Sequence, residues 1–70
     1  MMNERQRAVR EAINSLSDEY REIIVYSDIN QFSYDEISQI LKCPVGTIKS
    51  RLNRARNALK KILSAKRELF

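Results

Sequence analysis

The chain has 70 residues, with 13 lysines and arginines against 9 aspartates and glutamates, so its formal net charge is +4. A chain of this length forms one small domain, whose single core contributes only about 3–5 kcal/mol of net stability. A deep catalytic cleft needs more chain than this, so we expect no enzyme. One glycine and one proline leave few turns for a β-sheet protein, and the abundant Leu, Ile, Lys, Arg and Glu favour helices.

Composition also limits the cofactors and the compartment. The sequence has no histidine and a single cysteine, Cys43, which excludes an internal disulfide, a His/Cys zinc site and a His-based catalytic triad. We expect Cys43 to pack as a small hydrophobic residue, and we expect no cofactor. There is no run of 18 apolar residues and no apolar stretch behind the charges near the N-terminus, so we expect a cytoplasmic protein with no membrane partner.

The first helix is predicted to follow Asn3, whose side chain can cap it, and to end near Ser15. Its apolar residues recur at helical spacing: Val9, Ala12, Ile13 and Leu16. The second helix is predicted to start after Ser17, because Asp18 and Glu19 then lie at the positive end of the helix dipole. We expect it to run to about Asp28, with an apolar face made of Tyr20, Ile23 and Ile24.

The third helix is predicted to start at residue 34, since Ser33 and Glu36 have the spacing of a capping box. Pro44 disfavours helical geometry at Cys43, so the helix is short and ends near Lys42. We expect its single buried stripe to consist of Ile37, Ile40 and Leu41. The preceding Phe32 is predicted to anchor the loop, whereas Tyr34 is an exposed first helical residue that can pack or contact a partner.

The fourth helix is predicted to open at Pro44 or Val45 and to run for about five turns, roughly 27 Å. Its apolar stripe is unusually regular: Val45, Ile48, Leu52, Ala55, Leu59 and Ile62. Gly46 lies near its start, where we expect the close approach of another backbone or of a phosphate rather than a break. Together these elements predict an all-α fold, a small four-helix domain that spans residues 1–70.

Charge is divided between the two parts of the chain. Residues 1–41 contain four arginines and eight acidic residues, whereas residues 42–67 contain nine cations and no acid. A basic segment beside an acidic one is typical of a polyanion-binding surface next to a surface with another role. A solvated basic helix face without a partner is the alternative interpretation.

A short capped helix, a tight turn and a longer basic helix predict a helix-turn-helix at about residues 33–64, whose second helix lies in the major groove of DNA. On the face opposite the apolar stripe, Arg54 or Lys49 can pair with guanine, Asn53 with adenine, and Ser50 with either. Residues at the flanks are candidates for phosphate contact: Lys42, Thr47, Arg51, Arg56 and Lys60. Each also has a structural alternative, either simple solvent exposure or packing of an arginine stem along the stripe.

An apolar run at residues 23–26 is too wide for one buried stripe, so part of it can be a docking surface. A protein-interaction module is therefore a second hypothesis. A basic helix on anionic lipid is a weaker third, because residues 45–62 lack Trp and Phe anchors.

Three segments resemble region 4, the C-terminal domain of sigma factors of the sigma-70 family, most of all those of the extracytoplasmic-function (ECF) group. They are residues 16–22 (LSDEYRE), 32–37 (FSYDEI) and 43–56 (CPVGTIKSRLNRAR), and the resemblance covers about residues 13–63. The DNA-binding domain of response regulators has a similar lead-in to its recognition helix and is an alternative, but the segment RLNRAR favours the sigma version.

The resemblance implies a winged-helix-like domain of the sigma region 4 type that binds the minus-35 element of double-stranded promoter DNA. It implies docking on the flap of the RNA polymerase β subunit, with an anti-sigma factor as a further candidate partner. By position it implies Lys49, Ser50, Asn53 and Arg54 as promoter-contacting residues, with Thr47 near phosphates. The family's other domain, which binds the core enzyme and melts the minus-10 element, is expected to lie outside this sequence.

Overall fold

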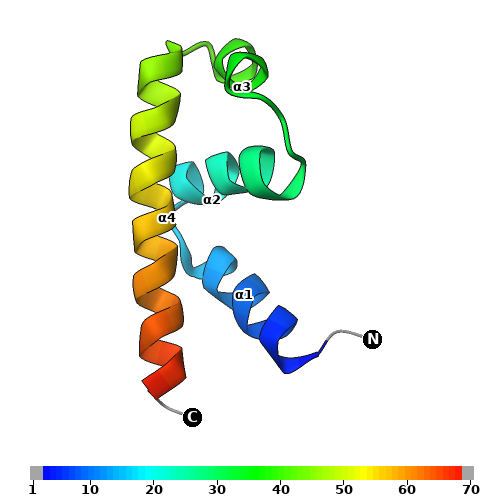
Figure 1. The fold of residues 1–70 in the computed structure, drawn as a ribbon, viewed down its shortest axis with the longest axis vertical. Coiled ribbons are helices and arrows are strands. Elements are labelled where there is room, and N and C mark those ends of the chain that lie inside the picture. The colour runs from blue at the N-terminus through cyan, green and yellow to red at the C-terminus, as the bar shows by residue number, and fades with distance from the viewer. Residues whose placement is uncertain (1–2, 69–70) are drawn as a thin grey trace.

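The computed structural model describes residues 3–68, and these fold into helices without a strand. In chain order the helices are α1 (Glu4–Ser15), α2 (Asp18–Ile24), α3 (Tyr34–Leu41) and α4 (Val45–Glu68), and a π-helical turn, η1 (Val25–Ile29), continues α2. The long α4 runs along one side of the molecule, and the three shorter helices pack against it one after another (Figure 1). The prediction of an all-α four-helix fold is confirmed.

Local caps determine where α1 and α2 begin. The backbone N–H of Gln6 donates to Asn3 Oδ1 (2.8 Å), and the Asn3 N–H donates to Gln6 Oε1 (3.1 Å), which makes a reciprocal capping box. The Tyr20 N–H donates to Ser17 Oγ (3.4 Å) at the start of α2. These bonds satisfy N–H groups that have no partner inside their helix, so the predicted starts of both helices are confirmed.

The predicted capping box of α3 is also present. The Ser33 N–H donates to Glu36 Oε1 (2.9 Å), and the Glu36 N–H donates to Ser33 Oγ (3.1 Å). At the other end Lys42 takes a left-handed conformation, with φ 55° and ψ 45°, and its N–H donates to the Ser38 carbonyl. This residue and the next two turn the chain into α4, so α3 and α4 form a helix-turn-helix.

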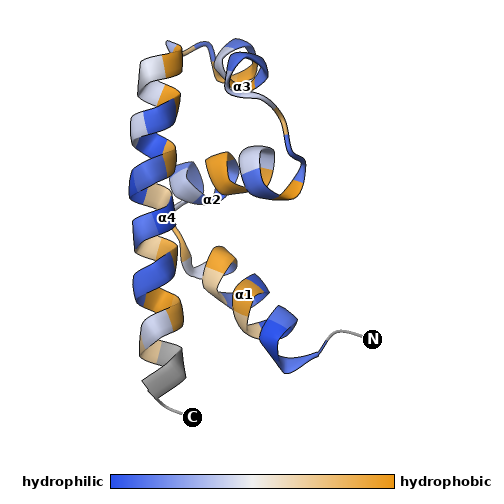
Figure 2. Cartoon of the chain, viewed as in Figure 1, coloured by the Kyte–Doolittle hydropathy of each residue, from blue (hydrophilic) through white to orange (hydrophobic). Residues whose placement is uncertain are grey.

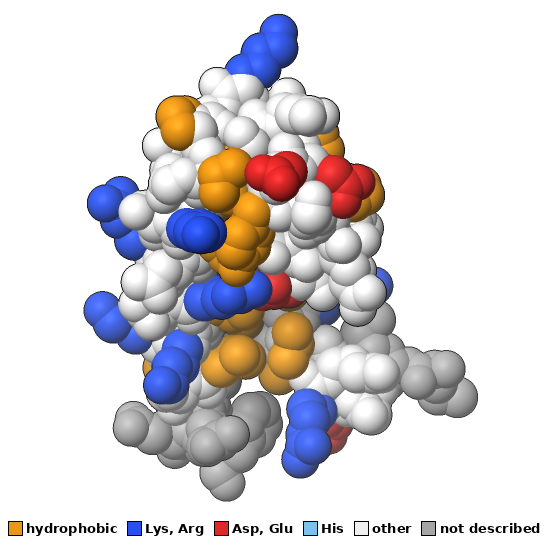
Figure 3. Space-filling view, turned by 45° about the horizontal axis from the view of Figure 1, so that its top comes forward, with side chains coloured by type: hydrophobic (Ala, Val, Ile, Leu, Met, Phe, Trp, Pro, Cys, Tyr) orange, Lys and Arg blue, Asp and Glu red, His pale blue; other side chains and the backbone are white. Residues whose placement is uncertain are grey.

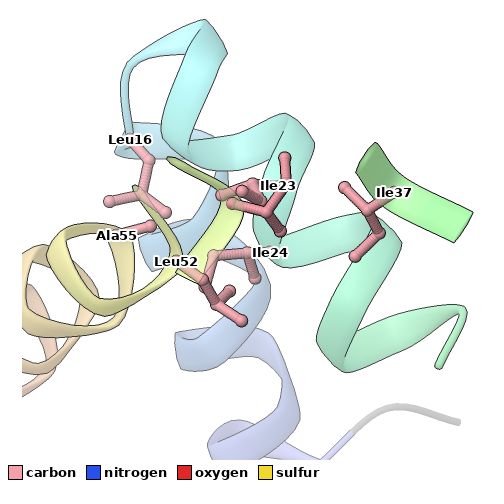
Figure 4. Packing of buried hydrophobic residues seen from close by; sticks show 7 residues of the cluster. Leu16, Ile23, Ile24, Ile37, Leu52 and Ala55 are labelled. Carbon is pink, nitrogen blue, oxygen red and sulfur yellow. The ribbon is translucent and has the colours of Figure 1, made fainter. Parts of the chain in front are cut away.

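The core lies between α4 and the three shorter helices. Ile48 and Leu52 of α4 are buried with Ile23 and Ile24 of α2, and Ile37 joins them from α3 (Figure 4). The side of α4 that carries its hydrophobic residues is turned toward the other helices, and its hydrophilic residues lie on the remaining sides (Figure 2). Burial of this one stripe therefore fixes which face of α4 is left for a partner.

Two burial predictions need correction. The prediction that Ile40 belongs to the buried stripe of α3 is wrong: Ile40 is 46% exposed, because α3 turns Ile37 and Leu41 toward the core instead. The predicted stripe of α4 is confirmed in the middle of the helix, where Ile48, Leu52 and Ala55 are buried. Toward its ends it is only half-buried, because the shorter helices do not cover the whole length of α4.

The end of the second helix differs from a regular α-helix. It stops at Ile29, one residue beyond the predicted end, but its last turn is π-helical, with the Asn30 N–H donating to the Val25 carbonyl (2.9 Å). Phe32 follows, packs against the core and stacks on Tyr26 with ring centroids 5.9 Å apart. The prediction that Phe32 anchors this loop is confirmed, and so is the packing of Cys43 against the core.

Candidate nucleic-acid interface

The four predicted base-contacting residues all lie on the exposed face of α4. Lys49, Ser50, Asn53 and Arg54 are exposed, whereas the neighbouring Ile48 and Leu52 are buried. At about 100° of rotation per residue, the four side chains span roughly 140° of the helix surface. Figure 3 shows several Lys and Arg side chains along the α4 side of the molecule, while other cations lie at its top, centre and bottom, two of them beside an acidic side chain. The face that the core leaves free is therefore polar and basic.

A polar hollow of about 480 Å³ lies at the start of α4. Thr47, Ser50 and Arg54 line it, so the structure brings two predicted base contacts next to a predicted phosphate contact. The remaining lining residues are Glu19, Pro44, Gly46 and Arg51. The hollow places hydroxyl and guanidinium donors beside the N-terminal turn of α4, where unpaired backbone N–H groups favour an anion.

Arg51 lies at the edge of this hollow but is engaged within the domain. Its Nε is 2.7 Å from Glu19 Oε1, and its side chain is only 24% exposed. A phosphate must compete with Glu19 for this guanidinium, so Arg51 contributes less net charge toward DNA than its sequence position suggests. Its phosphate contact stays a prediction.

Lys49 lies on the other flank of α4. Its Nζ is 6.0 Å from the centroid of the Tyr34 ring, at the first residue of α3. This distance is at the outer limit of a cation–π interaction. Tyr34 is 36% exposed, as predicted for that position.

Arg56 is turned toward η1. Its Nε donates to Asp28 Oδ2 (3.1 Å), and a terminal nitrogen donates to Asp28 Oδ1 (2.6 Å) and to Ser27 Oγ (3.5 Å). The hydrogen bond that Arg56 donates to Asp28 is the main cause that raises the pKa of Arg56, with a smaller contribution from Tyr34. The hydrogen bond from Arg56 in turn lowers the pKa of Asp28 below its usual 3.8. The predicted phosphate contact of Arg56 thus competes with a bidentate ion pair.

We expect this ion pair to make stability depend on pH. Because the folded-state pKa of Asp28 is depressed, the stabilisation is fully present at pH values well above the usual pKa of 3.8 and is lost as the pH falls through the folded pKa. An exposed pair contributes up to about 1 kcal/mol, so Asp28→Asn should lower the free energy of unfolding by at most that amount at pH 7. Urea unfolding at pH 7 and pH 3 should show the difference in unfolding free energy between wild type and Asp28→Asn become smaller at the lower pH.

Glu36 serves as an internal control for that experiment. Its pKa is also lowered, mainly by the hydrogen bond from the Ser33 backbone, so both proteins lose this capping stabilisation equally in acid. A gap that stays constant between pH 7 and pH 3 would show that the Asp28 carboxylate does not stabilise the fold through its charge.

The remaining predicted phosphate contacts are separated along the molecule. Lys42 is exposed in the turn between α3 and α4, and Lys60 is exposed four turns into α4 beside a shallow hollow. The side chains of Lys66 and Arg67, which also belong to the basic segment, lie outside the described residues. The structure therefore spreads the candidate phosphate contacts along α4 rather than gathering them at one point.

Gly46 needs a further correction. A Cβ built at this position would meet no atom within 4 Å, so among residues 3–68 no other element's backbone approaches it closely, and that part of the expectation is wrong. Helix α4 continues through it without a break, as expected. Approach of a phosphate stays a prediction, and the open space at the first turn of α4 is compatible with it.

Sequence reasoning missed Glu19, Asp28 and Ser27 as partners of the basic helix. Their acidic or polar character was visible, but the pairings depend on how α2 and η1 cross α4. Within residues 3–68 there is no cluster of three potential metal-ligating side chains. The described helices include none with the length and apolar character that crossing a membrane requires.

Comparison with known proteins places this arrangement in a family. Residues 3–59 match the family model described as sigma-70, region 4. The chain is 46% identical over 55 residues to the ECF RNA polymerase sigma factor SigW of Bacillus subtilis, a match that covers 79% of this chain and 29% of SigW. It is 39% identical over 59 residues to the ECF RNA polymerase sigma-E factor of Escherichia coli, which covers 84% of this chain and 31% of that protein.

The chain thus spans less than a third of the length of these curated relatives. The family match includes α1, α2, α3 and the part of α4 that carries the exposed basic face. The helix-turn-helix and the sequence match agree, and the chain belongs to the sigma-70 region 4 family.

Proposed function

We propose that this chain is the promoter-recognition domain of an ECF-type sigma factor and binds the minus-35 element so that RNA polymerase starts transcription at its promoters. The observation that supports this proposal most strongly is the exposed basic face of α4, which lies in a helix-turn-helix of a chain that belongs to the region 4 family. The family match favours this role over that of a response-regulator domain. The proposed role is binding, without catalysis.

Base recognition in this proposal depends on the outward side chains of α4 in the major groove. The Arg54 guanidinium and the Lys49 ammonium donate to the O6 and N7 acceptors of guanine. The Asn53 amide pairs with adenine, and the Ser50 hydroxyl can donate or accept. All four are exposed before DNA binds, so no part of the core has to move for them to reach base edges.

Phosphate contacts in this proposal set the register of α4 in the groove. Lys42 and Lys60 are exposed cations, and Thr47 lies in the hollow at the start of the helix. Arg51 and Arg56 join them only by giving up or sharing Glu19 and Asp28. Contacts of this kind position the protein without specifying sequence.

The salt dependence of DNA binding tests the phosphate contacts. With about three to five phosphates neutralised, the affinity for promoter DNA should fall with salt at a log–log slope of about −3 to −5. Lys60→Ala should make that slope shallower by about 1. Arg7→Ala on α1, also an exposed cation, is the matched control and should leave the slope unchanged. Fluorescence anisotropy from 50 to 300 mM salt measures the slope of log affinity against log salt for each protein. A slope near zero for the wild type would refute the proposed interface.

A second surface favours protein docking as an additional function. A groove of about 500 Å³ lies between α1 and the α2–η1 segment, and its floor is apolar: Val9, Ile13, Val25 and Ile29. Val9 is 36% exposed and Ile29 is 56% exposed. Arg5, Arg10 and Arg21 are among its other lining residues. None of these residues belongs to α4, so the groove is separate from the proposed DNA-binding face. The flap of the RNA polymerase β subunit, or an anti-sigma factor, is the proposed occupant.

We expect Ile29→Glu to weaken binding of the chain to purified RNA polymerase core about fivefold or more, because it buries a charge in an apolar contact. Its affinity for promoter DNA should not change. Ile40→Glu is the matched control, since Ile40 is 46% exposed on α3 and lies outside the groove. Biolayer interferometry with immobilised core enzyme measures the affinity of each variant for the polymerase. Equal losses for Ile29→Glu and Ile40→Glu would exclude the groove as the docking site.

A further inference from the structure

Tyr34 occupies a rigidly held position next to the proposed DNA-binding face. It is the first residue of α3, directly after the Ser33 that forms the capping box with Glu36. On the other side of Ser33, Phe32 is fixed by its stacking on Tyr26 and by an N–H···O bond to the Tyr26 carbonyl (3.0 Å). The backbone on both sides of Tyr34 is thus held, while its ring stays partly exposed.

The Tyr34 ring lies beside a long side chain that has no other partner among the described residues. Lys49 Nζ is 6.0 Å from the ring centroid, and Lys49 is an exposed residue of the second turn of α4. A lysine carries four rotatable bonds, so an unrestrained ammonium samples many positions. An aromatic face attracts the ammonium and narrows that range.

A second cation near Tyr34 does not compete for the ring. Arg56 is close enough for the Tyr34 hydroxyl to help raise its pKa, but the guanidinium is held mainly by Asp28. Arg56 therefore already has a partner in Asp28. The ring face is left for Lys49.

We propose that Tyr34 is a positioning residue that holds the Lys49 ammonium over its ring, so that Lys49 contacts base edges rather than neighbouring phosphates. This inference rests on the proposed promoter recognition and adds a specificity determinant from α3, outside the recognition helix. Tyr34 acts through Lys49, so its effect must disappear when Lys49 is absent.

A double-mutant cycle on DNA tests the coupling. Dissociation constants are measured for the promoter duplex selected by the wild type and for a scrambled duplex, with Tyr34→Leu, Tyr34→Phe, Lys49→Met and the Tyr34→Leu/Lys49→Met pair. Tyr34→Leu should weaken promoter binding about two- to fivefold, the size of an exposed cation–π contact, and leave scrambled DNA unchanged. Tyr34→Phe keeps the aromatic face and should stay within twofold of wild type. In the Lys49→Met background Tyr34→Leu should have no further effect.

Three results of this cycle would overturn the inference. The first is that Tyr34→Leu binds the promoter as tightly as wild type. The second is that Tyr34→Leu still weakens promoter binding in the Lys49→Met background. The third is that Tyr34→Phe loses as much promoter affinity as Tyr34→Leu. The last result would mean that the Tyr34 hydroxyl, and not its ring face, carries the effect. Circular dichroism of each variant establishes that the helices are intact.

A measurement without DNA separates this inference from the proposed function. The Lys49 side-chain protons should show an upfield ring-current shift in wild type and Tyr34→Phe, and that shift should vanish in Tyr34→Leu. If the wild type prefers no DNA sequence, the proposed function fails while the NMR shift still reports the positioning. If the shift is missing in the wild type, the inference fails whatever the protein binds.

Discussion

Arg54→Ala is expected to weaken binding to the cognate promoter by about 1–3 kcal/mol, roughly 5- to 150-fold, with little change on nonspecific DNA. Arg54 is exposed and lines the hollow at the start of α4 together with Thr47 and Ser50. Among the described residues it forms no ion pair, in contrast to Arg51 and Arg56. Its guanidinium is thus free for bidentate pairing with guanine, and the Arg54→Ala variant makes no such contact with that base.

The control for this prediction is Lys61→Ala, a nearby cation that is also exposed on α4 but has no proposed base contact. It should weaken binding to promoter and scrambled duplexes alike, because a general positive charge acts on both. Fluorescence anisotropy gives the dissociation constants of each variant for the promoter duplex and for the scrambled duplex, and the ratio of the two constants measures its specificity. If Arg54→Ala lost affinity equally on both, Arg54 would be a phosphate contact and the assignment to bases would be wrong.

Leu52→Ala is expected to cost about 2–5 kcal/mol of the free energy of unfolding. Leu52 is 1% exposed and lies in one cluster with Ile23 and Ile24 (Figure 4). A domain of this size has only about 3–5 kcal/mol in total, so the variant should lose about half or more of its stability. Urea titration followed by circular dichroism at 222 nm measures the change.

Ile40→Ala is the matched control for the core, since it removes a similar aliphatic side chain from an exposed site. Its cost should be within about 0.5 kcal/mol of zero. Equal losses for Leu52→Ala and Ile40→Ala would contradict the burial of the α4 stripe and, with it, the orientation of the basic face.

Features that depend on neighbours in sequence were predictable. Asn3 and Ser33 each cap a helix through a residue three positions later, so the spacing alone indicates the hydrogen bonds. The 3–4 spacing of apolar residues likewise indicates which side of α4 is buried. The exposed positions of Lys49, Ser50, Asn53 and Arg54 follow directly from it.

Features that depend on how helices cross were not predictable. The ion pair of Arg56 joins residues 28 positions apart, and nothing in the local sequence indicates that η1 brings Asp28 to α4. Pro44 indicated the end of α3, but Lys42 takes its left-handed conformation without the glycine that usually occupies such a position, and no residue type marks the π-helical turn at 25–29. Ile40 was misplaced for the same reason, because periodicity cannot show how wide a strip the neighbouring helix covers.

Selection of bound sequences from random double-stranded DNA tests promoter recognition by α4 most directly. It is carried out with the wild type and with Asn53→Ala and Arg54→Ala. The wild type should enrich one short motif, and each variant should lose preference at a different base pair of that motif while it keeps the others. Enrichment of no motif by the wild type, or of an identical motif by all three proteins, would contradict base recognition by the exposed face of α4.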